Sequence, residues 1–388
     1  MWYDVIVVGG GPAGATAAYE LARKGFDVIL LERRRLPRFK ACGGCLSPRA
    51  VDALGFDVKE AVEEIIYHAT FTYRGTDPFS VSSADPMGYM VERSRFDHLL
   101  CRKAVEAGAK LREGEEVKEV RLRDEGVEAT TPEARHLARL VIGADGVGSI
   151  VRRKLLPGHR PAPLAALEGR IALRPKRCEA LRGRVLVDFG LIPGGYAWAF
   201  PKADHVNVGV MGPTSQARRL KGFLFRFLDD HEVFAGYQIE LLKGAFIPAY
   251  DGRPRRIAGP RAFLIGDAAF LADPLLGEGI YYAIRSAQLA SQWAAKALLD
   301  GGTLLWEYQT QIAEGMSAEF RTALRFSKLA SWLPGLSYRA LKRRPGAVLA
   351  YADLLRGKGT YEGLLRQAKA EALAALGLWS KPSLGRRG

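Results

Sequence analysis

A glycine-rich turn near the N-terminus limits the fold of this 388-residue sequence more than any other feature. In "VIVVGGGPAG", an apolar run leads into the pattern Gly9-x-Gly11-x-x-Gly14. A helix is expected from residue 13 to about residue 24, and a second apolar run ends at Glu32. Strand, glycine turn, helix and strand in this order predict a βαβ unit, and therefore a parallel sheet.

Each position of this pattern has a physical role in binding a dinucleotide. Gly9 permits the tight turn, Gly11 lets the backbone approach a pyrophosphate, and Gly14 lets the helix pack against the strand. The helix N-terminus presents free N–H groups and a positive dipole end to the phosphates. A carboxylate at the position of Glu32 accepts hydrogen bonds from a ribose diol. Its charge disfavours NADP, although the following arginines weaken that argument, and both NAD and FAD stay open.

Charge and composition narrow the class of protein. The chain has 57 Lys and Arg against 42 Asp and Glu, a net charge of +15, and 48% hydrophobic residues. A basic surface favours anionic partners such as anionic lipid or phosphorylated small molecules. No nucleic-acid-binding pattern is present, so no nucleic-acid partner is expected. Charges interrupt the apolar runs, so no segment is predicted to span a bilayer. We expect a cytoplasmic protein with peripheral membrane contact.

The order of predicted elements indicates two interleaved domains. Segments typical of nucleotide binding alternate with strand-rich sequence, and the last part of the chain is mostly helical and basic. We expect an α/β protein: a Rossmann-like domain interleaved with an antiparallel-sheet substrate domain, plus C-terminal helices. The predicted boundaries are 1–60, 90–160 and 255–300 for the nucleotide-binding domain, 61–89 and 161–254 for the substrate domain, and 301–388 for the helical region.

Two further motifs identify the cofactor. "LVIGADGVGSIVRR" and "FLIGDAAFLADPLLGEGI" each place polar and glycine residues after a predicted buried strand: Asp145 and Gly146 in the first, and Asp267, Pro274, Gly277 and Gly279 in the second. Taken alone, the first is a common turn and Asp267 could be a helix cap. Together with the glycine turn, and in this order, they resemble the flavoprotein fold shared by aromatic hydroxylases and geranylgeranyl reductases. The resemblance covers about residues 1–300 and implies FAD as the cofactor.

The resemblance also assigns roles to single residues. The aspartate that corresponds to Asp267 binds the ribityl chain of FAD in that fold. A helix that starts near Gly279 and Ile280 points its N-terminus at the flavin pyrimidine edge, where reduced flavin carries negative charge.

Three more positions are assigned in the same way. Arg93, in "VERSRFD", matches the family pattern V-x-R-x-x-F-D, whose arginine lies by the flavin; the alternative is a solvated arginine at a helix start. Val117 and Ala13 match positions that contact the cofactor through their backbones.

Two motifs about 150 residues apart resemble those of geranylgeranyl reductases in particular. "RFKACGGCLSPRA" matches K-x-C-G-G followed by L-S-P-R, at Lys40, Cys42, Gly43, Gly44, Leu46, Ser47 and Pro48. "PGGYAWAFPK" matches P-x-x-Y-x-W-x-F-P, at Pro193, Tyr196, Trp198, Phe200 and Pro201.

The cysteine pair in the first motif raises the question of its chemistry. The resemblance places Cys42 and Gly43 against the flavin, where a thiol could influence substrate geometry or relay a proton. The family usually has a small residue where this chain has Cys45, so a Cys42–Cys45 disulfide or dithiol stays open, and Cys45 is counted among the cofactor contacts. A structural zinc site usually needs four ligands. Because Cys101 and Cys178 are isolated in the sequence, zinc is not expected, and no metal site is predicted.

The aromatic residues of the second motif alternate along a predicted strand. Tyr196, Trp198 and Phe200 therefore point to one face of the sheet. An apolar wall of this kind suits a long hydrocarbon tail. Spacing alone favours an ordinary sheet core, and the motif match favours the substrate wall. We expect these three residues to contact substrate and Cys42, Tyr196 and Trp198 to be catalytic.

The expected activity is reduction of carbon–carbon double bonds in a geranylgeranyl or other polyprenyl chain, carried by a diphosphate, lipid, quinone or pigment. Reduced FAD would deliver a hydride to the double bond, and a nearby acid would deliver a proton. The sequence shows no second glycine pattern for a nicotinamide domain, so the electron donor is NAD(P)H bound transiently or a ferredoxin. The alternatives are a flavin monooxygenase acting on an aromatic or apolar substrate, and a basic FAD protein without catalysis. Turnover without oxygen separates the prenyl reductase from the monooxygenase.

Overall fold

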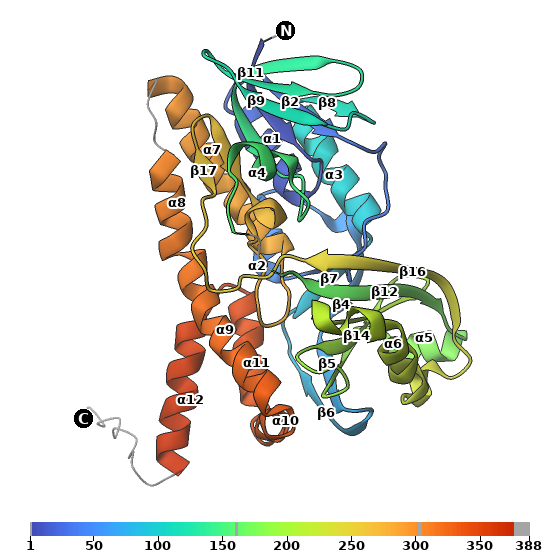
Figure 1. The fold of residues 1–388 in the computed structure, drawn as a ribbon. Coiled ribbons are helices and arrows are strands. Elements are labelled where there is room, and N and C mark those ends of the chain that lie inside the picture. The colour runs from blue at the N-terminus through green and yellow to red at the C-terminus, as the bar shows by residue number, and fades with distance from the viewer. Residues whose placement is uncertain (1, 160–161, 301–304, 376–388) are drawn as a thin grey trace, which may run out of the picture.

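The structure is a computed structural model that describes residues 2–159, 162–300 and 305–375. Figure 1 shows a parallel sheet with its helices at one end, an antiparallel sheet at the other, and a column of C-terminal helices beside both. The strands are β1 (Trp2–Val8), β2 (Val28–Glu32), β3 (Cys45–Leu46), β4 (Val62–Ile66), β5 (His68–Tyr73), β6 (Thr76–Ser82), β7 (Gly88–Val91), β8 (Lys110–Glu113), β9 (Glu119–Leu122), β10 (Val127–Thr130), β11 (Arg135–Gly143), β12 (Leu164–Ala172), β13 (Arg184–Phe189), β14 (Tyr196–Pro201), β15 (Val206–Pro213), β16 (Gln238–Ile247), β17 (Ala258–Gly259) and β18 (Ala262–Leu264). The α-helices are α1 (Pro12–Ala22), α2 (Pro48–Leu54), α3 (Arg93–Glu106), α4 (Ile150–Leu155), α5 (Pro175–Leu181), α6 (Leu220–Asp229), α7 (Ile280–Asp300), α8 (Leu305–Glu314), α9 (Met316–Trp332), α10 (Pro334–Arg343), α11 (Gly346–Leu355) and α12 (Tyr361–Ala375).

The first sheet has the order of a doubly wound fold. Its parallel strands run β8-β2-β1-β11-β18, with β17 antiparallel at the outer edge. In chain order this is 3-2-1-4-5, which is the Rossmann arrangement. β9 and β10 extend β11 as an antiparallel hairpin. Residues 5–8 of β1 are at most 4% exposed, because helices cover both faces of such a sheet and its strands are apolar on both sides.

The second sheet has seven strands in the order β16-β12-β15-β14-β13-β5-β6. All neighbours are antiparallel except β13 and β5. One face packs on α6 through Leu224, Phe227 and Leu228. The other face carries the side chains of Tyr196, Trp198 and Phe200 in a separate apolar cluster. A small third sheet, β3-β7-β4, contains the end of the cysteine motif.

The fold class expected from the sequence is confirmed. The 161–254 segment was expected to belong to an antiparallel-sheet domain, and the helices α5 and α6 also lie within it. α5 is short and starts at Pro175, whose fixed φ suits the first turn of a helix. We propose that the domains divide at the boundaries given above. The predicted 301–388 region lies partly outside the described residues, which leave out 301–304 and 376–388.

Candidate functional site

The glycine turn brings three segments into close contact. Gly9 has φ +105°, and a Cβ there would lie 2.5 Å from the carbonyl oxygen of Ala144. A Cβ on Gly14 would lie 1.8 Å from the carbonyl oxygen of Gly9. Any side chain at either position would therefore push α1 away from β1 and β11. Gly11 is the N-cap of α1 and supplies no side-chain cap, so the first N–H groups of the helix stay available to an anion.

A buried charge network lies directly beside this turn. One oxygen of Glu32 accepts from the Gly10 N–H at 2.8 Å, and Arg38 Nη2 lies 3.3 Å from the same oxygen. Arg38 Nη1 donates to Asp97 at 2.8 Å. Burial alone would lower the pKa of Arg38, but the carboxylates of Asp97 and Glu32 raise it above its ordinary value. Arg38 therefore keeps its positive charge next to the helix N-terminus.

These residues fit FAD. A Cβ added to Gly11 would meet only Arg38 Nη2, at 3.9 Å, so there is room in front of the helix N-terminus. A pyrophosphate there would face both the helix N–H groups and a guanidinium. Glu32 ends β2 with its carboxylate buried beside the turn, where it can accept from a ribose diol.

The other FAD motifs meet α1 from the opposite side. A Cβ on Gly266 would lie 3.1 Å from the Cβ of Ala13, and one on Gly279 would lie 3.7 Å from Asp267 Oδ1. The Gly-Asp pair and the start of α7 are therefore adjacent to the glycine turn. The remaining predicted positions are placed as follows: Val117 is buried in the core of this domain, Gly146 has φ +78°, Gly277 has φ +74°, Pro274 is buried, and Ile280 is the first residue of α7.

Asp145 has a local structural contact in addition to its predicted role. Its Cα lies 3.1 Å from the position of a Cβ on Gly9, so it does reach the turn. However, Asp145 Oδ2 accepts from the backbone N–H of Ile150 at 2.5 Å, at the start of α4. Oδ1 is buried without a hydrogen-bond partner among the described residues. Because that oxygen has no protein donor, it can accept from a cofactor hydroxyl.

Arg93 is buried rather than solvated. It is 8% exposed and makes two hydrogen bonds to Asp97, at 2.8 and 2.9 Å. Burial opposes its charge, but Asp97 and the Cys42 sulfur raise the pKa of Arg93 above its ordinary value. Asp97 thus joins Arg93 to Arg38. Asp97 was not predicted from the sequence, although it is the final residue of the "VERSRFD" motif.

The cysteine motif forms a loop with free thiols. Cys42, Cys45, Cys101 and Cys178, all within the described chain, are unpaired. Cys42 Sγ accepts from the Gly44 N–H at 3.4 Å and lies beside the Arg93 guanidinium. Cys45 is in β3, where burial raises the pKa of its thiol to about 12. The two cysteines therefore have different surroundings, with the Arg93 guanidinium beside Cys42 and a neutral thiol at Cys45.

The same loop packs directly on the aromatic residues of β14. A Cβ on Gly43 would lie 2.9 Å from the Phe200 ring and 3.2 Å from Trp198 Nε1. The ring centroids of Tyr196 and Trp198 are 6.0 Å apart, and those of Trp198 and Phe200 are 6.1 Å apart. The three rings thus form one row on one face of the sheet, and Gly43 lies against its end.

Lys202 fixes this loop and was missed in the sequence. It is 6% exposed, and its ammonium donates to the carbonyl oxygens of Gly43, Gly44 and Val91 at 2.9, 3.2 and 2.9 Å. Burial lowers the pKa of Lys202. The position of Lys202, directly after the Y-x-W-x-F-P motif, could have indicated a role at the site. It was not predicted, because a lysine at the end of a strand usually faces solvent.

A second buried chain of hydrogen bonds starts at Trp198. Its Nε1 donates to Asn207 at 2.9 Å, and the Asn207 amide donates to Glu168 at 3.3 Å. Glu168 also accepts from the backbone N–H of Cys42, and burial raises the pKa of its carboxyl group. Trp198 and Cys42 are therefore positioned by one shared network.

The loop after β18 completes the site from the other side. Tyr196 donates its hydroxyl to the carbonyl oxygen of Leu276 at 2.5 Å, and burial raises the Tyr196 pKa, so the hydroxyl keeps its proton. Asp273, in the same loop, accepts from the backbone N–H groups of Leu275 and Leu276 at 2.7 and 2.9 Å, and from the Tyr361 hydroxyl at 2.6 Å. Tyr361 belongs to α12, so a C-terminal helix holds this loop in place.

Asp273 predicts a measurable pH dependence of stability. Burial raises its pKa to about 6, which is about two units above an exposed aspartate and corresponds to about 3 kcal/mol. A carboxyl whose pKa is raised by folding favours the native state below about pH 4, and this advantage is lost as the pH rises to about 6. In Asp273→Asn, the amide oxygen can accept from the Leu275 and Leu276 N–H groups, and the amide nitrogen can donate to the Tyr361 hydroxyl oxygen. The free energy of unfolding of the variant, minus that of wild type, should therefore rise by about 3 kcal/mol as the pH goes from 4 to 7.

Urea unfolding at a series of pH values measures this difference. Asp124→Asn is the matched control, because Asp124 is exposed and its substitution should leave the wild-type profile unchanged. A difference between Asp273→Asn and wild type that stays constant from pH 4 to pH 7 would contradict the prediction.

Comparison with known proteins agrees with this geometry. Residues 2–162 match the family model described as FAD binding domain. Two digeranylgeranylglycerophospholipid reductases of Methanopyrus kandleri are each 31% identical: one alignment covers 92% of both chains, the other 93% of this chain and 99% of the relative. A geranylgeranyl bacteriochlorophyll reductase-like structure from Thermoplasma acidophilum superposes with a TM-score of 0.79 at 25% identity, covering 95% of this chain and 98% of that one. A flavin-dependent brominase, Bmp2, at 20% identity and a TM-score of 0.76, shares the fold alone.

Proposed function

The chain belongs to the geranylgeranyl reductase family of FAD-dependent oxidoreductases, and from this we propose that it saturates double bonds in the geranylgeranyl chains of a glycerophospholipid. The proposed substrate class follows the names of the relatives that match nearly the whole chain. It narrows the wider set of headgroups that the sequence allowed.

One observation carries the proposal: the cysteine loop of the FAD-binding half lies directly on the aromatic row of the second sheet. Gly43 leaves space for no side chain between the loop backbone and the rings of Phe200 and Trp198. The loop also reaches the charge network beside the glycine turn, since Cys42 contacts Arg93 and Arg93 contacts Asp97. An apolar surface and residues predicted to contact FAD therefore lie side by side, which suits an alkene held against the flavin.

The chemistry requires a hydride and a proton on the two carbons of each double bond. FAD supplies the hydride when it is bound and reduced. An isolated alkene is a poor hydride acceptor, so positioning must supply much of the rate. Tyr196, Trp198 and Phe200 orient the tail and exclude water from it. Leu276 and Asn207 fix the polar atoms of Tyr196 and Trp198, so the row is held rigidly.

We propose Cys42 as the proton donor. Its thiol loses a proton to the alkene carbon and becomes a thiolate. The Gly44 N–H and the Arg93 guanidinium both face that sulfur, so the negative charge left behind is stabilised. A proton from solvent then restores the thiol. Tyr196 is a poorer candidate, because its proton is held by the Leu276 carbonyl and its pKa is raised. Its proposed part, like that of Trp198, is to hold the substrate.

An anaerobic single-turnover experiment tests the function. Purified protein with FAD is reduced with dithionite and mixed with digeranylgeranylglycerophospholipid in detergent, while flavin absorbance and lipid mass are followed together. Flavin reoxidation with mass gains of two hydrogens per step is the expected result. Flavin that stays reduced until air enters, with no change in lipid mass, would overturn the proposal and favour the monooxygenase alternative.

The electron donor is NAD(P)H or a reduced ferredoxin. A net charge of +15 favours docking of an acidic electron carrier. Stopped-flow reduction of the bound flavin separates the two donors. A reduction rate that saturates with ferredoxin concentration and falls steeply with ionic strength would identify ferredoxin as the donor. Rapid reduction by NADPH alone would identify the nucleotide as the donor.

We also propose that the protein acts at a membrane surface. Within the described residues, none of the helices has the length and apolar content needed to cross a bilayer. The turn between α9 and α10, in the lower part of Figure 1, exposes Leu329, Trp332, Leu333 and Leu336, which are 57%, 87%, 47% and 56% exposed. The exposed cations Arg325, Lys328 and Arg339 flank them. Apolar side chains among cations are typical of a surface that inserts into an anionic lipid interface.

Trp332→Ser should weaken binding to phosphatidylglycerol vesicles by about tenfold or more, since burial of one large apolar side chain is worth about 1.5–3 kcal/mol. Co-sedimentation with vesicles measures the affinity. Trp2→Ser is the matched control: Trp2 is 49% exposed, and β1 begins near the N-terminus at the opposite end of the molecule (Figure 1). An equal loss of vesicle affinity in the two variants would argue against membrane binding through the turn between α9 and α10. Equal binding of the wild-type protein to neutral and anionic vesicles would also argue against it.

A further inference from the structure

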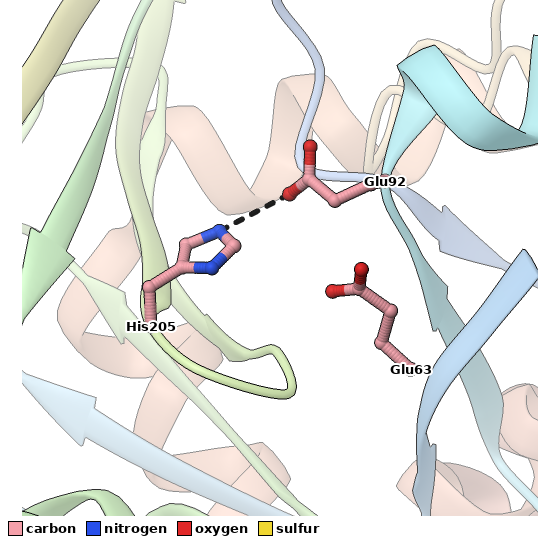
Figure 2. Close-up of side chains that lie close together, drawn as sticks. All are labelled: Glu63, Glu92 and His205. Atoms are coloured by element: carbon pink, nitrogen blue, oxygen red, sulfur yellow. Dashed lines mark ion pairs between the residues drawn. The ribbon is translucent and has the colours of Figure 1, made fainter.

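A histidine and two glutamates from distant parts of the sequence meet beside the Lys202 turn. His205 lies between β14 and β15, Glu92 precedes α3, and Glu63 is in β4. Figure 2 shows the three side chains converging on one space. One potential ligand atom from each lies within 4.8 Å of the other two. His205 is 3% exposed and the Glu63 side chain 7%, while the Glu92 side chain, at 27%, is reached by solvent.

The hydrogen bonds of His205 place an acceptor atom toward this space. Its Nδ1 lies 2.7 Å from Asp204 Oδ1, and since a carboxylate only accepts, Nδ1 carries the proton. If the ring is neutral, Nε2 then carries a lone pair and can only accept. That nitrogen lies 3.1 Å from Glu92 Oε1, which is also an acceptor. At this distance the two atoms are joined either by a second ring proton, which makes an imidazolium ion pair, or by a cation that both atoms bind.

Glu63 supplies a third acceptor without a donor. Its side chain is 7% exposed, and Oε2 is buried with no hydrogen-bond partner in the part of the chain that the structure describes. Oε1 has only Arg95 at 3.4 Å, and the Arg95 side chain is 68% exposed, so that contact is screened by water. Figure 2 shows the Glu63 carboxylate directed toward Glu92 and His205. A buried carboxylate oxygen without a partner is costly and marks an absent ligand.

The nearby lysine does not satisfy these acceptors. Lys202 is adjacent to the cluster, but its three N–H groups are directed to the carbonyls of Gly43, Gly44 and Val91. An ammonium has three donors and no more. Its charge offsets part of the negative charge of the glutamates, yet it leaves their oxygens free to bind another group.

We propose that Glu63, Glu92 and His205 bind one divalent transition-metal cation. One imidazole nitrogen and two carboxylates suit Mn²⁺, Fe²⁺ or Zn²⁺, whereas Ca²⁺ and Mg²⁺ prefer oxygen ligands alone. The Asp204 contact to Nδ1 is the carboxylate–histidine pairing that orients metal-binding imidazoles. Water would fill the remaining coordination positions.

The cation would be structural, and the site is independent of the proposed reaction. It would join the turn that carries Lys202 to the segment of Glu92, which is followed directly by Arg93. Both Lys202 and Arg93 contact the cysteine loop. Binding would therefore hold the second sheet against the FAD-binding half at the position of that loop.

Direct binding of Mn²⁺ to the FAD-loaded protein tests the proposal. After dialysis against EDTA and removal of the chelator, equilibrium dialysis should give one equivalent of Mn²⁺, with a saturable rise in Tm. Pulsed EPR of the complex should show coupling to one histidine nitrogen, and His205→Gln should abolish that coupling. Asp204→Asn should weaken Mn²⁺ binding by about 10-fold or more, as loss of such a partner usually does.

Matched variants separate this site from adventitious binding. Glu63→Gln should lose the bound equivalent, while Glu60→Gln, the same change at an exposed residue of the preceding turn, should keep it. If wild type binds no Mn²⁺, or the complex shows no nitrogen coupling, or both variants lose affinity equally, the proposal is wrong. Two protonated His205 nitrogens in ¹⁵N NMR, unchanged by added Mn²⁺, would likewise overturn it and assign the cluster as an imidazolium ion pair.

Discussion

Replacing Cys42 by alanine should slow the reduction of the prenyl chain by about a hundredfold or more, the usual contribution of a positioned acid. The substitution removes the proposed proton donor but leaves Gly43, Lys202 and the glycine turn intact. FAD content should therefore match wild type. The rate constant of flavin reoxidation in anaerobic single turnover measures the effect, and the flavin spectrum after gel filtration measures cofactor binding.

Cys45→Ala is the control for this substitution, because it removes a thiol two positions away in the same loop. Burial holds the pKa of Cys45 at about 12, so its thiol is a poor acid and its loss should change the rate only a few-fold. Equal rates in wild type and Cys42→Ala would contradict the role of Cys42. A solvent deuterium isotope effect in wild type that disappears in Cys42→Ala would further support proton donation by this thiol.

Replacing Lys202 by methionine should lower the free energy of unfolding by about 2 kcal/mol or more. Each buried carbonyl left without a donor costs about 1–3 kcal/mol, and of the three carbonyls that Lys202 contacts, Gly44 keeps the Val91 N–H as a donor. Methionine keeps the length of the side chain but removes all three hydrogen bonds, to Gly43, Gly44 and Val91. The cysteine loop should also shift relative to the aromatic row, and a displacement of about 1 Å can cost about a hundredfold in rate.

Urea unfolding followed by tryptophan fluorescence measures the stability, and flavin content reports whether the FAD-binding residues remain assembled. Lys243→Met is the matched control, since Lys243 is exposed on β16 and its substitution should change stability by less than about 0.5 kcal/mol. A Lys202→Met protein as stable as the control would mean that water, and not the ammonium, satisfies the three carbonyls.

The sequence predicted the FAD-binding fold and the aromatic row because local patterns determine both. The glycine spacing requires a tight turn after a strand, and alternation in β14 requires that Tyr196, Trp198 and Phe200 share a face. These elements are placed as expected. The contact of Gly43 with that row was not predicted, since it joins two segments about 155 residues apart whose packing no local pattern reports.

The buried charged residues of the candidate site could not be predicted from the sequence. Lys202, Asp97, Arg38 and Glu168 are residue types that usually face solvent. Here three of them are buried and the Arg38 side chain is only 11% exposed, because a partner from another segment satisfies each one. Arg93 was predicted to lie by the flavin, with a solvated helix start as the alternative. Its burial against Asp97 excludes the solvated alternative, while contact with FAD stays a prediction.

Five of the seven strands of the second sheet are inserted between β11 and β18, which has a consequence for how the chain must fold. β18 pairs with β11, yet all of β12 to β16 is encoded between them. A fragment such as residues 2–162, which the FAD-binding family model covers, would lack β18 and the Gly266-Asp267 pair and would leave β11 with an open edge. Such an edge can pair with other chains and aggregate. During synthesis, this domain can close only after the whole inserted sheet has been made, so its folding is expected to be slow and dependent on long-range contacts.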